Sequence, residues 1–269
     1  MNPRELLELA GLSASGEPTP LAGGDMGQVW RLGDYVVKTH PAAPDQLFVA
    51  EKRGLEELAA AGARTPRVYW AGREGIVMSY LPPGPADWAG LATMLARLHG
   101  QRRSDYGASD PTFIGRLPLA QGSDDDWRRY WREKRLLPLV ELTAAQLGGL
   151  AALLERFVND YDWLAEGPVL IHGDLWNGNV LMSSRGPALI DPSAWVGERA
   201  VDLAMMRLFG GFPAGFWRAY QEALPAPADV EEAVPAYQLY FLLVHVHFFG
   251  AGYLPPIRRV LESYKAIER

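Results

Sequence analysis

The run Leu81-Pro82-Pro83-Gly84-Pro85 is the strongest interruption in this chain of 269 residues. Proline fixes φ and has no amide hydrogen to donate, so regular structure should stop at this run. The segments before it are short and carry β-branched and aromatic residues, whereas apolar residues after it recur mostly at helical spacing. We therefore expect a sheet-containing lobe at residues 1–81 and a larger, mainly helical lobe at residues 82–269.

The first lobe reads as a small antiparallel sheet with one helix. Gln28–Leu32 and Tyr35–Thr39 are strand-like runs, and the Gly33-Asp34 pair between them is a hairpin signal. Residues 45–60 have apolar positions spaced for a helix with one buried stripe. Two further strand-like runs follow at residues 68–70 and 75–80.

The second lobe has one exception to its helical pattern. Helices are predicted around residues 91–98, 127–137 and 144–164. Between residues 169 and 191, apolar runs flank a polar loop, which predicts a loop between strands and then a hairpin. The apolar stretch 239–253 is shorter than the roughly 20 residues of a membrane span and reads as a buried helix. The expected fold class is α+β, with two lobes and a cleft between them.

Charge and composition exclude several classes of function. The formal net charge is −6, and no basic face of the kind found in nucleic-acid binders is visible in the sequence. The chain has no cysteine, which excludes disulfides, thiolate chemistry and cysteine-bound metals. The N-terminus lacks an apolar signal core. We expect a cytoplasmic protein that binds neither nucleic acid nor membranes, although local groups could still hold a small anionic substrate.

The polar loop Ile171-His172-Gly173-Asp174-Leu175-Trp176-Asn177-Gly178-Asn179 carries the strongest chemical signal. Phosphoryl transfer requires Mg²⁺ to neutralise the phosphates of ATP and a carboxylate near the attacking hydroxyl group. Asp174 is the predicted base, and Asn179 and Asp191 offer the oxygen ligands that Mg²⁺ prefers. Asp and Asn also mark ordinary turns. The complete His-Gly-Asp-x-x-x-x-Asn string, with Ile-Asp twelve residues later, favours the catalytic interpretation.

The first lobe offers candidates for holding a nucleotide. Gly23, Gly24 and Gly27 form a glycine-rich segment whose amides could approach phosphate oxygens closely. Lys38 ends a predicted strand and Glu51 lies in the following helix, which suits a lysine–glutamate pair that holds the α- and β-phosphates. The alternatives are ordinary loop glycines and solvated surface charges.

The segment Met78-Ser79-Tyr80-Leu81 is the expected hinge between the lobes. Its backbone carbonyl and amide groups can imitate the edge of a base and so bind adenine, while Met78 and Leu81 offer apolar contacts. Met78 and Tyr80 are therefore candidate nucleotide-binding residues. A plain edge strand is the alternative interpretation.

Several other polar residues read as structural. His172 is expected to brace the catalytic loop, and His99 to be a satisfied core residue. His245 and His247 are two positions apart, which points them to different faces of a helix and makes them a poor metal pair. Asp202 either caps a helix or holds the catalytic loop through hydrogen bonds to its backbone.

Together these strings resemble the fructosamine kinase (ketosamine 3-kinase) family, within the aminoglycoside phosphotransferase and choline kinase-like superfamily. The superfamily pattern is the HGD-x-x-x-x-N loop with the later Asp. The narrower likeness lies in HGDLWNGN at residues 172–179 and in Asp191-Pro192-Ser193. Further similar segments span nearly the whole chain, namely Phe113-Ile114-Gly115, Asp126-Trp127, Arg135-Leu136, Gly197, Arg199 and residues 202–205, 208–212 and 237–253.

The resemblance implies a protein-kinase-like fold and a distinct reaction. That reaction is the ATP- and Mg²⁺-dependent phosphorylation of a sugar hydroxyl, at O3, of a ketoamine, which is the adduct of a sugar and an amine. Such phosphates decompose and release the amine, which is a deglycation role. By position, Asp174 would be the base and Trp176 would stack on the sugar. A monomer or weak dimer acting on small glycated amines is expected.

The chain also departs from the family pattern. Ala200 stands where Glu is frequent, Trp195-Val196 replaces an aromatic pair, and His245-Val246-His247 replaces Asn-rich sequence. The cysteine that links redox state to dimerisation in some members is missing. Two alternatives stay open: a phosphotransferase for an aminoglycoside, choline or homoserine, and a nucleotide-binding module without catalysis.

Overall fold

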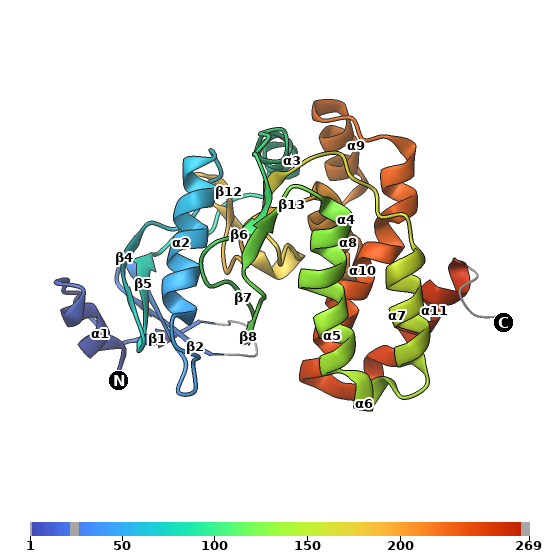
Figure 1. Cartoon of the computed structure of the whole chain (residues 1–269). Coiled ribbons are helices and arrows are strands. Elements are labelled where there is room, and N and C mark those ends of the chain that lie inside the picture. Colours follow the sequence, from blue (N-terminus) through green and yellow to red (C-terminus); the bar gives the residue numbers. More distant parts are fainter. Residues whose placement is uncertain (1, 22–26, 265–269) are drawn as a thin grey trace.

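The computed structural model describes residues 2–21 and 27–264, which form two parts that lie side by side (Figure 1). The part at the left of the figure is a sheet with helices on it, and the part at the right is a bundle of helices. Short strands lie between the two. The expected α+β, bilobal fold class is therefore confirmed.

The first part is built on a five-stranded sheet with the strand order β1-β2-β3-β5-β4. The predicted hairpin forms β2 and β3, which pair in the antiparallel register Trp30↔Val37. β3 lies at the centre and pairs on its other side with β5 through Val37↔Val77. The strands are β1 Thr19–Pro20, β2 Gln28–Leu32, β3 Tyr35–Thr39, β4 Val68–Gly72 and β5 Gly75–Ser79.

Two helices cover the sheet, one on each face. The predicted helix α2 (Leu47–Ala60) buries Phe48 against the side chains of β5. α1 (Pro3–Leu9) buries Leu6 against alternate residues of β3 and β5. α1 was not expected from the sequence, although Asn2 and Glu5 form a capping box at its start.

The second part is mainly helical, as expected. The helix predicted over residues 144–164 is divided into α6 and α7, however, because the backbone turns at Gly148 with φ 54°. The prediction over residues 127–137 covers α4, a π-helical segment η1 and the start of α5. The helices are α3 Trp88–His99, α4 Trp127–Tyr130, η1 Trp131–Leu136, α5 Leu137–Leu142, α6 Ala144–Leu147, α7 Leu150–Asp160, η2 Asn177–Asn179, α8 Arg199–Phe209, α9 Ala214–Ala223, α10 Ala228–Phe249, η3 Gly250–Tyr253 and α11 Leu254–Ser263.

The longest helix, α10, crosses the middle of the helical part (Figure 1). Tyr237, Leu239, Phe241 and Leu243 of this helix are fully buried, so the apolar stretch predicted there is a core helix. No helix in the described part of the chain combines the length and the apolarity needed to cross a membrane.

Short strands of the second part position the loop after β10. A four-stranded sheet has the order β10-β13-β6-β9, of which only β10 was expected. The predicted hairpin forms β11 and β12, and the proline-rich run docks on it because the Gly84 amide donates to Met182 O at 2.8 Å. These strands are β6 Tyr106–Ala108, β7 Phe113–Ile114, β8 Leu117–Pro118, β9 Gly122–Asp124, β10 Val169–Ile171, β11 Val180–Ser183, β12 Gly186–Leu189 and β13 Trp195–Gly197.

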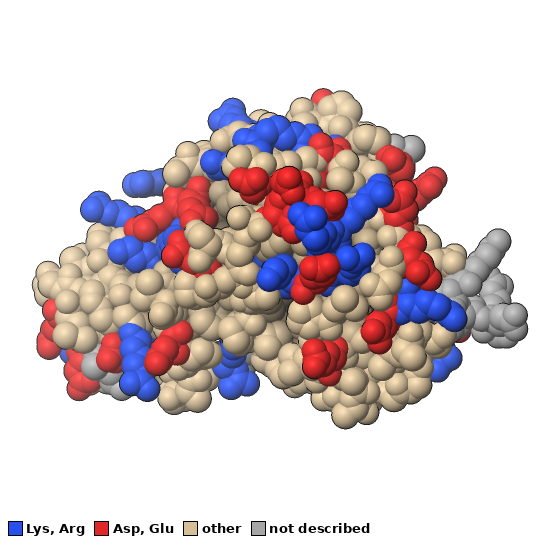
Figure 2. Space-filling model, viewed as in Figure 1, with Lys and Arg blue, Asp and Glu red and all other residues tan. Residues whose placement is uncertain are grey.

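Charged side chains of both signs are mixed over the face shown in Figure 2. Arg129, for example, pairs with Asp124 and Asp125 at the start of α4. On this face, groups of opposite sign lie next to one another.

Glu198, between β13 and α8, is a buried carboxyl group in this framework. Its Oε1 accepts hydrogen bonds from the Tyr106 hydroxyl at 2.6 Å and from the Gly167 amide at 2.9 Å. Burial raises the pKa of Glu198 to about 7, although these hydrogen bonds oppose the shift. The folded protein therefore keeps a proton that the unfolded chain releases near pH 4.5.

Replacing Glu198 with Gln is expected to flatten the pH dependence of stability. The contribution of the wild-type carboxyl group is fully present below about pH 4.5 and is lost as the pH rises through about 7. The neutral amide oxygen can still accept the hydrogen bonds from Tyr106 and Gly167, although the acceptor for the Glu166 backbone is lost, so the variant should exceed the wild type above pH 7 by less than about 3 kcal/mol. Denaturant unfolding at pH 5 and pH 8 measures this, with the exposed Glu155→Gln as control. Equal pH dependence in wild type and Glu198→Gln would contradict the expectation.

Candidate active site

The loop after β10 has a backbone conformation that requires glycine. Gly173 has φ 77°, and a Cβ at this position would collide with the carbonyl oxygen of Ser193 and approach Trp195 Nε1 to 3.0 Å. Only glycine fits there. The fully buried Asp202 carboxylate accepts hydrogen bonds from the amides of His172 and Gly173, each at 2.8 Å. The loop-holding role expected for Asp202 is thereby confirmed.

His172 braces the same loop from the inside. Its Nε2–H donates to the carbonyl oxygen of Ile190 at 2.9 Å, and its Nδ1 accepts from the amide of Asp174 at 3.3 Å. Burial lowers the pKa of His172, so the ring is neutral at pH 7. The ring therefore braces the loop, as the sequence predicted, and also links Asp174 to Ile190, the residue before Asp191.

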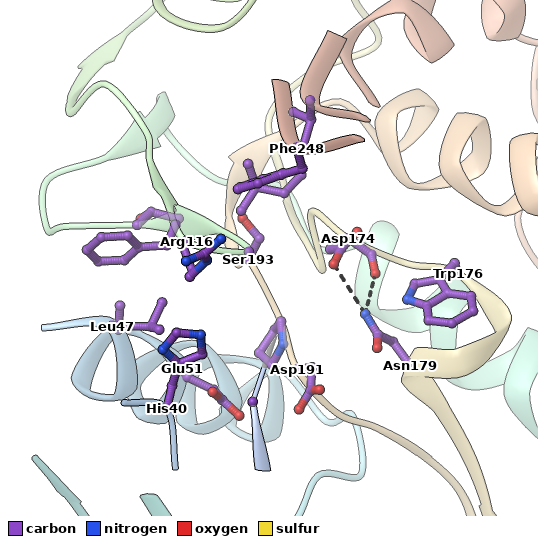
Figure 3. Close-up of a pocket in the computed structure, with 18 of the residues that line it drawn as sticks. His40, Leu47, Glu51, Arg116, Asp174, Trp176, Asn179, Asp191, Ser193 and Phe248 are labelled. Atoms are coloured by element: carbon purple, nitrogen blue, oxygen red, sulfur yellow. Dashed lines mark hydrogen bonds between the residues drawn. The ribbon is translucent and has the colours of Figure 1, made fainter. Parts of the chain in front are cut away.

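Asp174 and Asn179 face one another at this loop (Figure 3). The Asn179 amide nitrogen donates to the backbone oxygen of Asp174 at 2.7 Å and lies 3.4 Å from its Oδ2. Burial raises the pKa of Asp174 to about 7, and the negative charges of Asp191 and Asp202 add to the shift. A carboxyl group with a pKa near 7 can exchange a proton with a bound molecule at neutral pH.

Lys38 connects the sheet of the first part to Asp191 in the second. Its Nζ lies 3.0 and 3.1 Å from the two carboxylate oxygens of Glu51 and 3.0 Å from Asp191 Oδ1. The contact predicted between Lys38 and Glu51 is therefore present. Burial would lower the pKa of Lys38, but the charges of Asp191 and Glu51 outweigh it and raise that pKa. Burial would raise the pKa of Asp191, yet Lys38 holds it below its usual value.

Asn179 and Asp191 are arranged so that they could share a divalent cation. The amide nitrogen of Asn179 is engaged with Asp174, which leaves its oxygen for another partner, and Figure 3 shows that oxygen on the side of Asp191. The carboxylates around Lys38 carry more negative charge than Lys38 neutralises. One carboxylate and one amide oxygen, completed by phosphate and water oxygens, suit Mg²⁺. Within the described residues, no group of three or more His, Asp or Glu side chains could hold a metal by itself.

A cavity of about 530 Å³ joins these groups. The predicted site residues that line it are Gly27, Lys38, Glu51, Asp174, Trp176, Asn179 and Asp191. Gly23 and Gly24, the other predicted phosphate-binding glycines, lie outside the described residues.

The two predicted hinge residues do not line this cavity. Met78 is buried in β5, where it packs with Phe48 of α2. The amide of Tyr80 donates to the carbonyl oxygen of Asp34 at 2.7 Å, and its ring lies 3.8 Å from the guanidinium carbon of Arg31. A nucleotide base at the hinge would therefore have to use a backbone group other than the Tyr80 amide.

One wall of the cavity is aromatic, which the sequence did not predict. Phe209 lies 6.5 Å from Trp176 and 4.9 Å from His245 between ring centres, and His245 lies 4.8 Å from Tyr253. The residues Trp176 and Phe249 remain 40% and 52% exposed, so a bound molecule could cover them. His245 lines the cavity as well, and its Nδ1 donates to the carbonyl oxygen of Phe241 at 2.7 Å, which agrees with the structural role predicted for it. The sequence feature that could have indicated this aromatic wall is the cluster of aromatic residues after His245.

Arg116 also lines the cavity and was not predicted. It lies in the turn between β7 and β8, where no periodic pattern marks the direction of a side chain. Its neighbours Phe113, Ile114 and Gly115 line the cavity as well. The similarity noted for that string was the only sequence signal near it.

Comparisons with known proteins agree with this arrangement. A family model described as fructosamine kinase matches residues 8–267. A protein of Thermus thermophilus named "probable ketoamine kinase" is 52% identical over 263 residues, which cover 98% of this chain and 100% of that protein.

Solved structures show the same likeness. The chain is similar to a "putative fructosamine-3-kinase" from Thermobifida fusca, with a TM-score of 0.86, 30% identity and coverage of 97% of this chain and 98% of that one. It is also similar to APH(2")-IIa in a ternary complex with streptomycin and ATP, with a TM-score of 0.61, 15% identity and coverage of 92% and 91%. Because the identity to APH(2")-IIa is only 15%, this similarity concerns the fold alone. It confirms the expected protein-kinase-like fold.

Proposed function

The chain belongs to the fructosamine kinase family, and we propose that it phosphorylates the sugar of ketoamines at O3, with ATP as donor and Mg²⁺ as metal. Membership of this family supports a kinase that acts on ketoamines. The observation that carries the proposal is the meeting of Asp174, Asn179, Asp191 and the Lys38–Glu51 pair around one cavity. Phosphoryl transfer to a hydroxyl group needs a base, metal ligands and a cation for the phosphates.

Asp174 would act as the base. As the sugar oxygen bonds to the γ-phosphorus, the bond from that phosphorus to the bridging oxygen of ADP breaks, and the hydroxyl proton passes to the Asp174 carboxylate. The pKa of about 7 suits this exchange. The hydrogen bond from Asn179 to the Asp174 backbone helps to fix the position of the carboxylate.

The nucleotide would bind to both parts of the protein. Asn179 and Asp191 would hold Mg²⁺, which neutralises the charge of the phosphate oxygens when it is bound. Lys38, oriented by Glu51, would contact the α- and β-phosphates. We assign nucleotide binding to residues 1–81 and catalysis with acceptor binding to residues 82–269. In the first lobe, Gly23, Gly24 and Gly27 would cover the phosphates, and Met78 and Tyr80 would mark the adenine site.

The acceptor would lie on the aromatic side of the cavity. The exposed face of Trp176 can stack on a sugar ring, because the C–H groups of a sugar pack well on an indole. Phosphorylation at O3 would then lead to release of the free amine, a deglycation role. We propose that the enzyme acts in the cytoplasm as a monomer or weak dimer.

Replacing Glu51 with Gln is expected to weaken nucleotide binding. Glu51 holds Lys38 through two hydrogen bonds to a charged group, and loss of such an interaction costs about 1.5–3 kcal/mol. We expect the Kd for MgATP to rise about tenfold or more. Isothermal titration calorimetry measures the change. Glu56→Gln, at an exposed position of the same helix, is the matched control. Wild-type affinity in Glu51→Gln would contradict the assigned role.

The acceptor class is tested by a substrate panel. ATP turnover is measured with fructoselysine, ribuloselysine and erythruloselysine, and separately with choline, homoserine and an aminoglycoside. We expect phosphorylation of the ketoamines, with NMR of the product locating the phosphate at O3. Turnover of only the second set would assign the protein to a neighbouring phosphotransferase class.

A further inference from the structure

One cation that lines the cavity, Arg116, has no partner among the residues that the structure describes. Lys38 is held between two carboxylates. His40 accepts an amide hydrogen bond at its Nδ1 from Ala42 at 3.0 Å, and burial and Arg116 lower the pKa of His40, so the ring is neutral at pH 7. Burial likewise lowers the pKa of His245. Among the residues that the structure describes, Arg116 has no ion-pair or hydrogen-bond partner, so its charge is available to a bound molecule.

Arg116 is presented by a firmly held hairpin. β7 and β8 pair through Ile114↔Leu117, and the buried side chain of Ile114 anchors the hairpin in the core. Gly115, with φ 57°, permits the tight turn directly before Arg116. The Leu119 amide closes the hairpin by donating to Thr112 O at 2.8 Å. The position of the arginine backbone is therefore fixed before any ligand binds.

The same hairpin is tied to the helix that carries Glu51. Arg53 of α2 donates a hydrogen bond to the carbonyl oxygen of Pro111 and lies 3.8 Å from Asp110. Figure 3 shows the Arg116 side chain directed into the cavity, across from Asp174. A molecule with a hydroxyl group at Asp174 could therefore reach Arg116 with its other end.

Ser193 gives a second, independent sign of a ligand. Its side chain lines the cavity, is 3% exposed, and has no hydrogen-bond partner for its hydroxyl group among the described residues. Its backbone is fixed, because its amide donates to His172 O at 2.9 Å. Other buried polar atoms of the described residues also lack a partner, but Ser193 is the one of them that belongs to a residue lining the cavity, so its hydroxyl group could donate to a bound molecule. Figure 3 shows Ser193 on the same side of the cavity as Arg116.

We propose that Arg116 and Ser193 bind a carboxylate of the acceptor, so that the preferred ketoamines are adducts of amino acids whose carboxylate is free. This inference rests on the proposed function and names its substrate class. A guanidinium group matches a carboxylate with two parallel hydrogen bonds, and the serine hydroxyl adds a third donor. Asp174 and Asp191 at the other end of the cavity repel an anion. The acceptor should therefore bind with its hydroxyl group at Asp174 and its carboxylate at Arg116. A lysine adduct within a protein has its carboxylate in a peptide bond and lacks this contact.

The experiment compares two acceptors that differ in one group, the fructose adducts of glycine and of glycinamide. For the wild type we expect kcat/KM to be at least about tenfold higher with the carboxylate than with the amide. Arg116→Gln should bring this ratio close to one, and Arg116→Lys, which keeps the charge but not the paired donors, should give an intermediate ratio. Ser193→Ala should lower the ratio by a few-fold. Arg128→Gln, on an exposed arginine outside the cavity, should leave the ratio as in the wild type.

Three results would overturn the inference. If wild-type protein phosphorylates both adducts equally well, no carboxylate site exists. If Arg116→Gln lowers turnover of both adducts by the same factor and raises the KM for ATP, Arg116 contacts the phosphates of the nucleotide. If neither these adducts nor the panel of ketoamines is phosphorylated, the proposed function fails and the inference fails with it.

Discussion

Replacing Asp174 with Asn is expected to lower kcat by a factor of about a thousand, while the protein stays folded and binds MgATP. Removal of a positioned general base typically lowers the rate by about 10²–10⁴-fold. The amide has the same shape as the carboxyl group, and the bond from Asn179 to the Asp174 backbone oxygen does not depend on the side chain. The loss should therefore appear in kcat and not in the nucleotide Kd. Steady-state kinetics with a ketoamine acceptor and calorimetry with MgATP measure the two quantities.

The stability of the Asp174→Asn variant, compared with that of the wild type, distinguishes a catalytic role of Asp174 from a structural one. Burial raises the pKa of Asp174 from 3.8 to about 7, so the folded protein keeps a proton that the unfolded chain has lost. The resulting stabilisation is fully present below about pH 3.8 and is lost as the pH rises through about 7. At pH 8 the neutral Asn variant should thus be at least as stable as the wild type. Asp160→Asn, on the exposed end of α7, is the control, and a less stable but active Asp174→Asn protein would contradict the catalytic assignment.

The features that could be predicted from the sequence depend on the properties of a few neighbouring residues, or on contacts between residues that are close together in the chain. The proline-rich run ends regular structure wherever it occurs, and Gly33-Asp34 turns the chain between two strands. Lys38 and Glu51 are thirteen residues apart, and a strand followed directly by a helix on the same sheet brings such positions together. Asp174 and Asn179 lie on one loop, so their contact follows from the loop alone.

The cavity wall could not be predicted in the same way. Phe209 ends α8, while His245 and Phe249 belong to α10, and only tertiary packing brings them to Trp176. The apolar residues of α10 are spread around the helix and do not form one stripe, so its pattern does not indicate which residues face the cavity. The direction of Arg116 depends on a two-residue turn between strands that are themselves too short to show an alternating pattern.

Several helices and strands could not be predicted from the sequence for a different reason. α1 has seven residues, which is too short for a clear periodic pattern, and its capping box was the better signal. The division between α6 and α7 follows from the positive φ of Gly148, whereas an isolated glycine within a helical pattern is compatible with a continuous helix. β13 pairs with β6, which is far away in the chain, and β6 pairs with β9 across the intervening β7–β8 hairpin, so these partners are not visible in the local sequence.

Replacing Asp202 with Asn is expected to reduce both stability and activity, because Asp202 fixes the backbone on which Asp174 stands. Its two oxygens accept the amides of His172 and Gly173, and Oδ2 also lies 3.2 Å from His99 Nε2. An amide group has only one acceptor oxygen. In either orientation its NH₂ group would face a buried backbone N–H, and that N–H would lose its partner. A buried polar group without its partner costs about 1–3 kcal/mol, and breaking a buried charged contact costs up to about 5 kcal/mol.

The loss of activity should exceed what unfolding explains. Gly173 already has a positive φ that its hydrogen bond to Asp202 helps to hold, so release of this amide should move Asp174 relative to the acceptor. A displacement of about 1 Å can lower the rate about a hundredfold. We expect kcat to fall by about that factor at a temperature where circular dichroism shows a folded protein, with the KM for ATP little changed. Tyr220→Phe is the matched control, because it removes the hydroxyl group that contacts His99 at 2.9 Å and Arg199, and leaves both backbone contacts of Asp202 intact. If Asp202→Asn kept wild-type kcat, or if Tyr220→Phe lowered kcat equally, the backbone contacts of Asp202 would not be what positions Asp174.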